Sequence, residues 1–142
     1  MRLLLDSHVF LWFVLIDPRL SPKAKSMIED PSNVILISPA TYWEMSIKVA
    51  IGKLDLLTSF DNFMARGIAG NNFAILPIEL SHARRVSEFG KGHLHKDPFD
   101  RMLVAQALVE GIPLISADAH SMPMVSPVSG ECSPRFNRST RS

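Results

Sequence analysis

The sequence predicts an α/β fold in which helices flank a mainly parallel sheet of four to five strands. Short apolar runs of strand length alternate along the chain with longer segments that have helical patterns. Ser-Pro or Asp-Pro pairs, which cap and start helices, precede three of those segments. With 142 residues, of which 46% are hydrophobic, the chain is long enough for one domain with a single buried core.

The N-terminal part of the chain predicts two strands and two helices. Residues 2–5 form a short buried strand, and residues 7–16 form a helix that is apolar on nearly every side. Ser21-Pro22 supplies an N-cap and a first-turn proline for a helix that runs through residue 28. Residues 33–37 are the second strand. The apolar helix needs cover on several of its faces.

The middle of the chain repeats this order of elements. Ser38-Pro39 starts a helix that runs to about residue 50, before Gly52 breaks the pattern. A further helix spans residues 60–68, and residues 73–78 are the third strand. Strands and helices that alternate in this way form parallel sheets with right-handed crossovers.

The last helices and the last strand have clear boundary signals. Ser81 caps a helix that stops near Gly90-Lys91-Gly92. Asp97-Pro98 opens a strongly apolar helix over residues 99–109, which Gly111 closes, and residues 112–115 are the fourth strand. The periodicity then ends. We therefore predict a domain over residues 1–125 and a flexible polar tail, rich in Ser, Pro and Arg, over residues 126–142.

The composition excludes several classes of protein. Cys132 is the only cysteine, which excludes a disulfide framework or a cysteine-based zinc site and favours a reducing compartment such as the cytoplasm. Asp6 and His8 interrupt the apolar stretch of residues 3–16, so we interpret it as core and not as a signal peptide. No other apolar run approaches the ~20 residues that cross a bilayer, and no membrane partner is expected. The net charge of +1 is too small to identify a polyanionic partner.

Four aspartates are predicted to converge at one edge of the sheet. Asp6 directly follows the first strand and Asp118 follows the fourth, and parallel strands end at the same edge. Asp97 and Asp100 are three residues apart at the start of a helix, so they project from one side of its first turn towards that edge.

Glu44 is a fifth candidate, from the helix after the second strand. It lies on the stripe shared by Ala40, Ile47 and Ile51, where an unpaired carboxylate would be costly to bury. It therefore needs a cationic partner, and Lys48 stands four residues later. Five carboxylates in one pocket would repel each other, and their oxygen ligands suit Mg²⁺ or Mn²⁺. A bound divalent ion is the simplest way to relieve that repulsion.

Each aspartate also has an ordinary structural role. Asp6 and Asp118 are typical strand-end turn residues, and Asp97 before a proline is a good N-cap. Asp100 complements the helix dipole, and Asp97 with Arg101 forms an i,i+4 ion pair worth about 0.3–0.5 kcal/mol. The common predicted location of these acids favours one site over several independent coincidences.

Four segments resemble, in order, the motif regions of PIN-domain nucleases. They are LLLDSHVFLW, PATYWEMSIK, HKDPFDRMLVAQA and PLISADAH. The likeness is strongest to the VapC-like toxins of type II toxin–antitoxin systems, covers about residues 1–120, and is most specific in HKDPFDR. The family pattern places its acids on Asp6, Glu44, Asp100 and Asp118, with Asp97 as an additional acid typical of this subgroup.

The resemblance also implies a fold, an activity and partners. It implies a three-layer α/β/α sandwich, a magnesium- or manganese-dependent endoribonuclease, an RNA substrate and a small cognate antitoxin. Ser116 falls where the family usually has threonine or serine, and it either orients Asp118 or a water, or is an ordinary strand-end hydroxyl. Arg101 and Lys96 either hold flanking phosphates or are solvated surface charges.

One departure from the family pattern concerns the end of the domain. The family usually continues beyond Asp118 with an aromatic residue and a final strand, whereas this chain has His120-Ser121-Met122-Pro123 and then a polar segment. We therefore expect a fifth strand that is missing or irregular, or one restricted to a sheet edge, where proline is tolerated.

The hypothesis for the mechanism is hydrolysis by a metal-activated water. Asp6, Glu44, Asp100 and Asp118 would hold one or two divalent ions, which lower the pKa of an attacking water. In-line attack would expel the 3′ oxygen and leave 5′-phosphate and 3′-hydroxyl ends. The all-round apolar first helix, together with Trp12, Phe13, Trp43 and Ile47, is expected to expose surface that a second protomer, in a homodimer, or an antitoxin covers.

The alternatives to a nuclease are two other families that use a strand-end Asp and one binding module. A haloacid-dehalogenase phosphatase needs a second Asp two residues after the first, where this chain has His8, and a receiver domain needs an acidic pair that is missing here. The strongest alternative is a catalytically impaired PIN-like module that binds RNA or an antitoxin. Metal dependence separates the two, because a binding module would retain RNA in the presence of a chelator.

Overall fold

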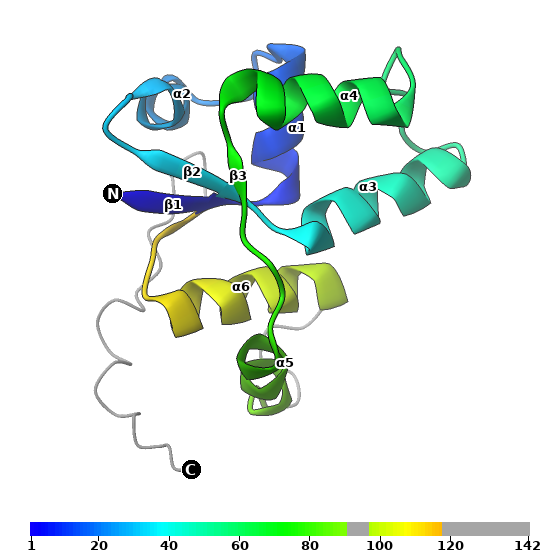
Figure 1. Ribbon diagram of the computed structural model, residues 1–142. Helices are drawn as coiled ribbons and strands as arrows, with labels where there is room; N and C mark the ends of the chain where they lie inside the picture. Colours follow the sequence, from blue (N-terminus) through cyan, green and yellow to red (C-terminus); the bar gives the residue numbers. More distant parts are fainter. Residues whose placement is uncertain (91–96, 118–142) are drawn as a thin grey trace.

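The computed structural model describes residues 1–90 and 97–117, which form an α/β fold with a four-stranded parallel sheet (Figure 1). The strand order is β3-β2-β1-β4, and all three pairs of neighbours are parallel. This confirms the predicted fold class. The strands are β1 (Arg2–Leu5), β2 (Val34–Ile37), β3 (Ala74–Ile75) and β4 (Leu114–Ile115).

Helices cover both faces of the sheet. Figure 1 shows α1, α2 and α4 on one side of it and α5 and α6 on the other, while α3 extends away from the carboxyl end of β2. A short 3₁₀ turn, Ala69–Asn71, follows α4. The helices are α1 (Ser7–Leu15), α2 (Pro22–Glu29), α3 (Pro39–Ala50), α4 (Phe60–Gly67), α5 (Leu80–Ser87) and α6 (Pro98–Glu110). None of the described helices is long and apolar enough to cross a membrane.

The core is divided by the sheet into two clusters because successive side chains of a strand point to opposite faces. Leu3 and Leu5 of β1 belong to the larger cluster, together with Phe10 of α1. Leu4, between them, belongs to the smaller cluster with Leu103 of α6. Apolar side chains on both faces of each strand are typical of parallel sheets covered by helices.

Helix starts agree with the local sequence signals in most places. Ser21, Ser38 and Asp97 are N-caps, as predicted, and each side chain accepts a hydrogen bond from a backbone N–H of its helix. The prediction that Ser81 caps a helix was wrong, because α5 begins earlier, with Glu79 at the cap position. There the Glu79 N–H donates to Nδ1 of His82, at 2.9 Å, and the buried His82 fixes the start of the helix.

The third and fourth strands are shorter than the predicted residues 73–78 and 112–115. Pro77 and Pro113 lie in these segments and have no N–H to donate to a neighbouring strand. The carbonyl oxygen of Pro113 still accepts a hydrogen bond from the Leu4 N–H, at 3.0 Å, and keeps this edge of the sheet in register. Lys96, Asp118, the expected fifth-strand region and the predicted tail lie outside the described residues.

Candidate active site

Asp6 stands at the carboxyl end of β1, between two elements. Its Oδ1 accepts a hydrogen bond from the Val9 N–H at 3.0 Å, which caps α1. Its Oδ2 accepts a hydrogen bond from the Ala117 N–H at 3.2 Å, just beyond β4. The Asp6 N–H in turn donates to the Ile115 carbonyl at 3.0 Å. The carboxylate is therefore held at the carboxyl ends of two neighbouring strands, which is where the sequence placed it.

Asp97 and Asp100 begin α6 close to that edge. Oδ1 of Asp97 accepts a hydrogen bond from the Phe99 N–H at 2.9 Å, so Asp97 does cap the helix. The pKa of Asp100 is raised to about 6, first because surrounding protein atoms remove water from the carboxyl. Repulsion from Asp97, Asp6 and Glu44 raises it further, and His8 acts in the opposite direction. Asp100 therefore interacts electrostatically with carboxylates from the end of β1 and from α3.

Glu44 is a buried carboxylate on α3, with an exposed fraction of only 6%. The Ser7 hydroxyl donates to its Oε1 at 2.7 Å, and Nζ of Lys48 lies 3.1 Å from its Oε2. The predicted need for a cationic partner is confirmed, because an unpaired buried carboxylate would be strongly destabilising. Ser7 was not predicted as a site residue, because its only signal in the sequence is a polar side chain between a strand and an apolar helix.

Two expectations about the surroundings of these acids were wrong. Ile47 and Ile51 do not share the burial of Glu44, since they are 39% and 60% exposed. The buried face of α3 instead comprises Ala40, Thr41, Glu44 and Met45. The ion pair of Asp97 with Arg101 does not form within the described part of the chain, where Asp97 bonds to backbone N–H groups of its own helix.

The acids fit a hard divalent cation in their chemistry. All of them offer oxygen ligands, and the pKa of Asp100 is raised by burial and then by repulsion from Asp97, Asp6 and Glu44. Within residues 1–90 and 97–117, no three Asp, Glu, His or Cys side chains lie close enough to hold an ion by themselves. Asp118, the fourth predicted ligand, lies outside those ranges. The described acids alone therefore do not make up a complete metal site.

Two further predicted site residues, Ser116 and Arg101, are described in the structure. Ser116 directly follows β4 and is half-buried, one residue before the Ala117 N–H that binds Asp6. Arg101 is half-buried in α6, and its N–H donates to the Asp97 carbonyl at 3.1 Å.

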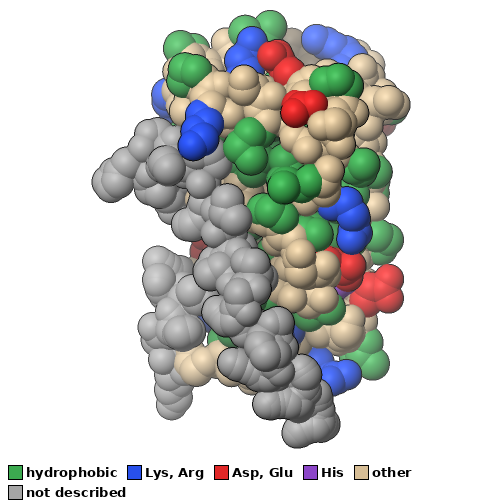
Figure 2. Space-filling model, turned by 90° about the vertical axis from the view of Figure 1, so that its left-hand side faces the viewer, with side chains coloured by type: hydrophobic (Ala, Val, Ile, Leu, Met, Phe, Trp, Pro, Cys, Tyr) green, Lys and Arg blue, Asp and Glu red, His purple; other side chains and the backbone are tan. Residues whose placement is uncertain are grey.

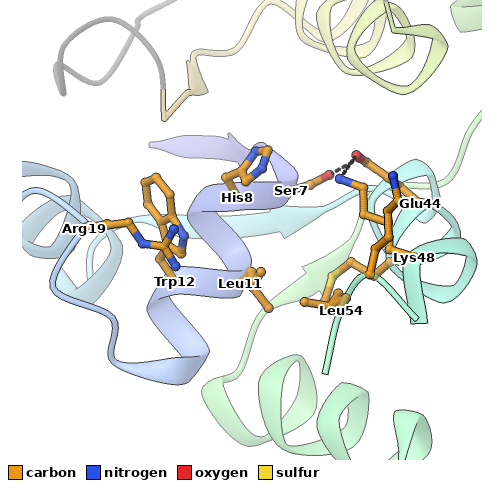
Figure 3. A pocket seen from close by; sticks show the side chains of 10 residues that line it. Ser7, His8, Leu11, Trp12, Arg19, Glu44, Lys48 and Leu54 are labelled. Atoms are coloured by element: carbon orange, nitrogen blue, oxygen red, sulfur yellow. Dashed lines mark hydrogen bonds and ion pairs between the residues drawn. The ribbon is translucent and has the colours of Figure 1, made fainter. Parts of the chain in front are cut away.

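A cavity of about 240 Å³ opens beside Glu44, between α1 and α3 (Figure 3). We call it the Trp12 pocket. Figure 3 shows Glu44 and Lys48 on one side of it, Trp12 with Arg19 on the other, and Leu11 and Leu54 between them. It is lined by Ser7, His8, Leu11, Trp12, Arg19, Glu44, Met45, Lys48, Lys53 and Leu54. Two of its cationic residues, Arg19 and Lys53, were not predicted, because they come from segments without a recognisable motif.

The side of the molecule on which the strands begin carries side chains of mixed kinds. Figure 2 shows the side of the molecule on which the strands begin, and the coloured part of that surface mixes acidic, basic and hydrophobic side chains. No charge of one sign dominates the part of this face that is described.

Comparisons with known proteins agree with the fold. The model of the PIN domain family matches residues 3–122. A search of curated proteins found no match. Among solved structures, the chain is similar to the crystal structure of VapBC2 from Rickettsia felis, with a TM-score of 0.58 and 17% identity. In that structure VapBC2 is bound to a DNA fragment from its promoter. That likeness covers 80% of this chain and 86% of the other, and at this identity it concerns the fold alone.

Proposed function

The chain belongs to the PIN domain family, a family of nucleases, and from that premise we propose that it is a metal-dependent endoribonuclease and the toxin of a toxin–antitoxin pair. The single observation that carries the proposal is the electrostatic interaction of Asp100 with Asp97, Asp6 and Glu44. These acids come from three separate segments of the chain, and ordinary capping roles do not require them to approach one another. A shared catalytic centre does require these acids to lie close together.

The proposed cofactor is Mg²⁺ or Mn²⁺, held by Asp6, Asp100, Glu44 and Asp118, with Asp97 as an additional acid. When bound, a divalent ion offsets phosphate charge and lowers the pKa of water. The protein supplies the positions of the carboxylates. Hydrogen bonds from Val9 and Ala117 fix Asp6, and Ser7 and Lys48 fix Glu44.

The proposed reaction is hydrolysis of an RNA phosphodiester. A water oxygen bonds to phosphorus, the bond from phosphorus to the 3′ oxygen breaks, and the 3′ oxygen takes up a proton. The products carry 5′-phosphate and 3′-hydroxyl ends. In this scheme Ser116 orients Asp118 or the attacking water, and Arg101 and Lys96 hold neighbouring phosphates, since carboxylates alone would repel RNA.

The proposed protein partners are a small antitoxin and a second copy of the chain, and we place the protein in the cytoplasm. The structural neighbour from R. felis is a VapBC2 complex, which supports an antitoxin partner. Exposed apolar side chains on α3 support a protein interface: Trp43 is 61% exposed and Ile47 39% exposed. Trp12 and Phe13, in contrast, are half-buried against the core.

The test is cleavage of mixed RNA by purified, partner-free protein in Mg²⁺ or Mn²⁺, with a chelator control and mapping of the new ends. We expect cleavage that stops in the chelator and leaves 5′-phosphates. RNA that stays intact under both metals, with a protein shown to be folded by circular dichroism, would contradict the nuclease. Retention of that intact RNA on the protein in chelator would identify a binding module instead.

A second prediction concerns Ser7 as a positioning residue. Ser7→Ala removes the 2.7 Å hydrogen bond to Glu44, and we expect kcat to fall by about 10-fold with KM nearly unchanged. Ser46→Ala is the matched control on α3, because its hydroxyl donates only to the Trp43 carbonyl. Steady-state kinetics on a fluorogenic oligoribonucleotide measure both constants. Equal activity of the two variants would show that Glu44 needs no support from Ser7.

A further inference from the structure

In the Trp12 pocket, the guanidinium of Arg19 lies over the ring of Trp12. The Arg19 guanidinium carbon lies 5.0 Å from the centre of the Trp12 ring. The Asp17 carboxylate accepts hydrogen bonds from Nη2 of Arg19 at 2.8 Å and from Nε at 3.1 Å. Because Asp17 fixes the guanidinium and balances its charge, the Arg19–Trp12 pair offers stacking surface at a small further cost in entropy. Such stacking surfaces bind unpaired nucleobases.

The same pocket has cationic side chains near the catalytic acids. Lys48 and Lys53 both line it. The Lys53 N–H donates to the Lys48 carbonyl at 2.8 Å, which fixes the position of Lys53 just after the end of α3. Lys48 shares its charge with Glu44. Lys53 forms no ion pair with any residue in the described part of the chain. A positive charge without a protein partner, beside carboxylates that would repel a polyanion, suits a phosphate.

The Arg19–Trp12 pair and the lysines lie on opposite sides of the Trp12 pocket, which reaches Glu44. Figure 3 shows Trp12 and Arg19 on one side and Lys48 with Glu44 on the other, separated by Leu11 and Leu54. A nucleotide has the same division into a flat base and a charged phosphate. An acidic peptide would satisfy the lysines but would not require the stacking surface, so the combination favours nucleic acid over protein.

We infer that the Trp12 pocket binds one unpaired nucleotide of the RNA substrate, with its base on the Arg19–Trp12 pair and its phosphate at Lys53 and Lys48. The inference rests on the proposed function, because the pocket ends at Glu44. The base must be unpaired, since a base in a duplex has no free face to stack on a side chain.

Binding can be measured separately from cleavage through the fluorescence of Trp12. The chain has two tryptophans, so Trp43→Phe leaves Trp12 as the only one. In chelator, we expect single-stranded oligoadenylate to quench this emission saturably, because a stacked base quenches indole, and an RNA duplex to have little effect. Trp12→Phe, which keeps Trp43, is the matched control and should give no quenching. Quenching by polyglutamate but not by oligoadenylate would overturn the inference in favour of a protein partner.

Lys53 provides a second test that needs no tryptophan variant. In Lys53→Ala we expect KM for single-stranded RNA to rise several-fold with kcat nearly unchanged. The slope of log K for oligoadenylate against log salt concentration should become shallower by about 0.7, the value for one lost phosphate contact on a single strand. Arg84→Ala removes one exposed cation from α5, on the far side of α6, and should leave the slope unchanged.

The outcomes separate this inference from the proposed function. RNA cleavage by the wild type, with an unquenched Trp12 and with Lys53→Ala equal to Arg84→Ala, would overturn the nucleotide pocket and leave the nuclease in place. Quenching and the altered salt slope without cleavage in any metal would support the pocket and overturn the nuclease.

Discussion

Asp100→Asn is expected to lower kcat/KM for RNA by at least about 100-fold and to make the metal-free protein more stable. The charged carboxyl of Asp100 is unfavourable in the folded state, because burial and repulsion from Asp97, Asp6 and Glu44 raise its pKa to about 6. Asparagine removes that charge with little change in shape. Protein atoms surround part of the Asp100 carboxyl, but the residue remains accessible to solvent, so screening reduces the expected gain in stability to about 1 kcal/mol, or roughly 3 °C in Tm.

The stability gain has a defined pH dependence. The Asp100 carboxyl titrates near pH 3.8 when unfolded and near pH 6 when folded, so between these values the folded state binds the proton more tightly. The contribution of this group to stability therefore falls as pH rises from about 4 to 6. Thermal melts in chelator should show the advantage of Asp100→Asn above pH 6 and none below about pH 4.

Asp61→Asn is the matched control, because Asp61 also lies in the first turn of a helix, α4, and is exposed. Its carboxylate complements the helix dipole, so its loss should slightly lower Tm and leave cleavage unchanged. A melting temperature for Asp100→Asn at or below that of the wild type at pH 7.5 would contradict the electrostatic crowding at α6.

Features set by neighbouring residues could be predicted from the sequence. Ser21, Ser38 and Asp97 cap helices because their side chains reach backbone N–H groups two or three residues away. The parallel order of strands and the position of Asp6 follow from the alternation of apolar runs with helical segments. The i+4 spacing also identified Lys48 as the partner of Glu44.

Features that depend on distant packing could not be predicted in this way. The start of α5 depends on His82, which is buried with its Nε2 2.8 Å from Oε2 of Glu110, a residue of α6. Ile51 is exposed because α3 extends away from the sheet, a direction that helical periodicity does not encode. The Trp12 pocket likewise joins α1 and α3 to Arg19 and Lys53, which come from segments without a motif.

Asp6→Asn is expected to abolish cleavage as strongly as Asp100→Asn, by at least about 100-fold in kcat/KM, but with the opposite effect on stability. The asparagine oxygen can still accept the hydrogen bond from the Val9 N–H, because asparagine caps helices as well as aspartate does. Its NH₂ group, however, cannot accept the hydrogen bond that the Ala117 N–H now donates to Oδ2 at 3.2 Å. The loss of that bond should cost about 1–2 kcal/mol.

Asp6→Ala removes both of the described hydrogen bonds of the Asp6 carboxylate, so comparison with Asp6→Asn separates their contributions. This variant also removes the cap of α1 and should lower stability by a further ~0.5–2 kcal/mol, with no further loss of activity. Asp30→Asn is the control, because the Asp30 side chain accepts a local hydrogen bond from the Ser32 N–H and precedes β2, at the opposite end of the sheet. Urea unfolding in chelator gives the order of stability, and RNA cleavage in Mn²⁺ gives the activities. Substantial cleavage by Asp6→Asn would place the catalytic centre elsewhere, because a capping role alone leaves the charge of Asp6 dispensable.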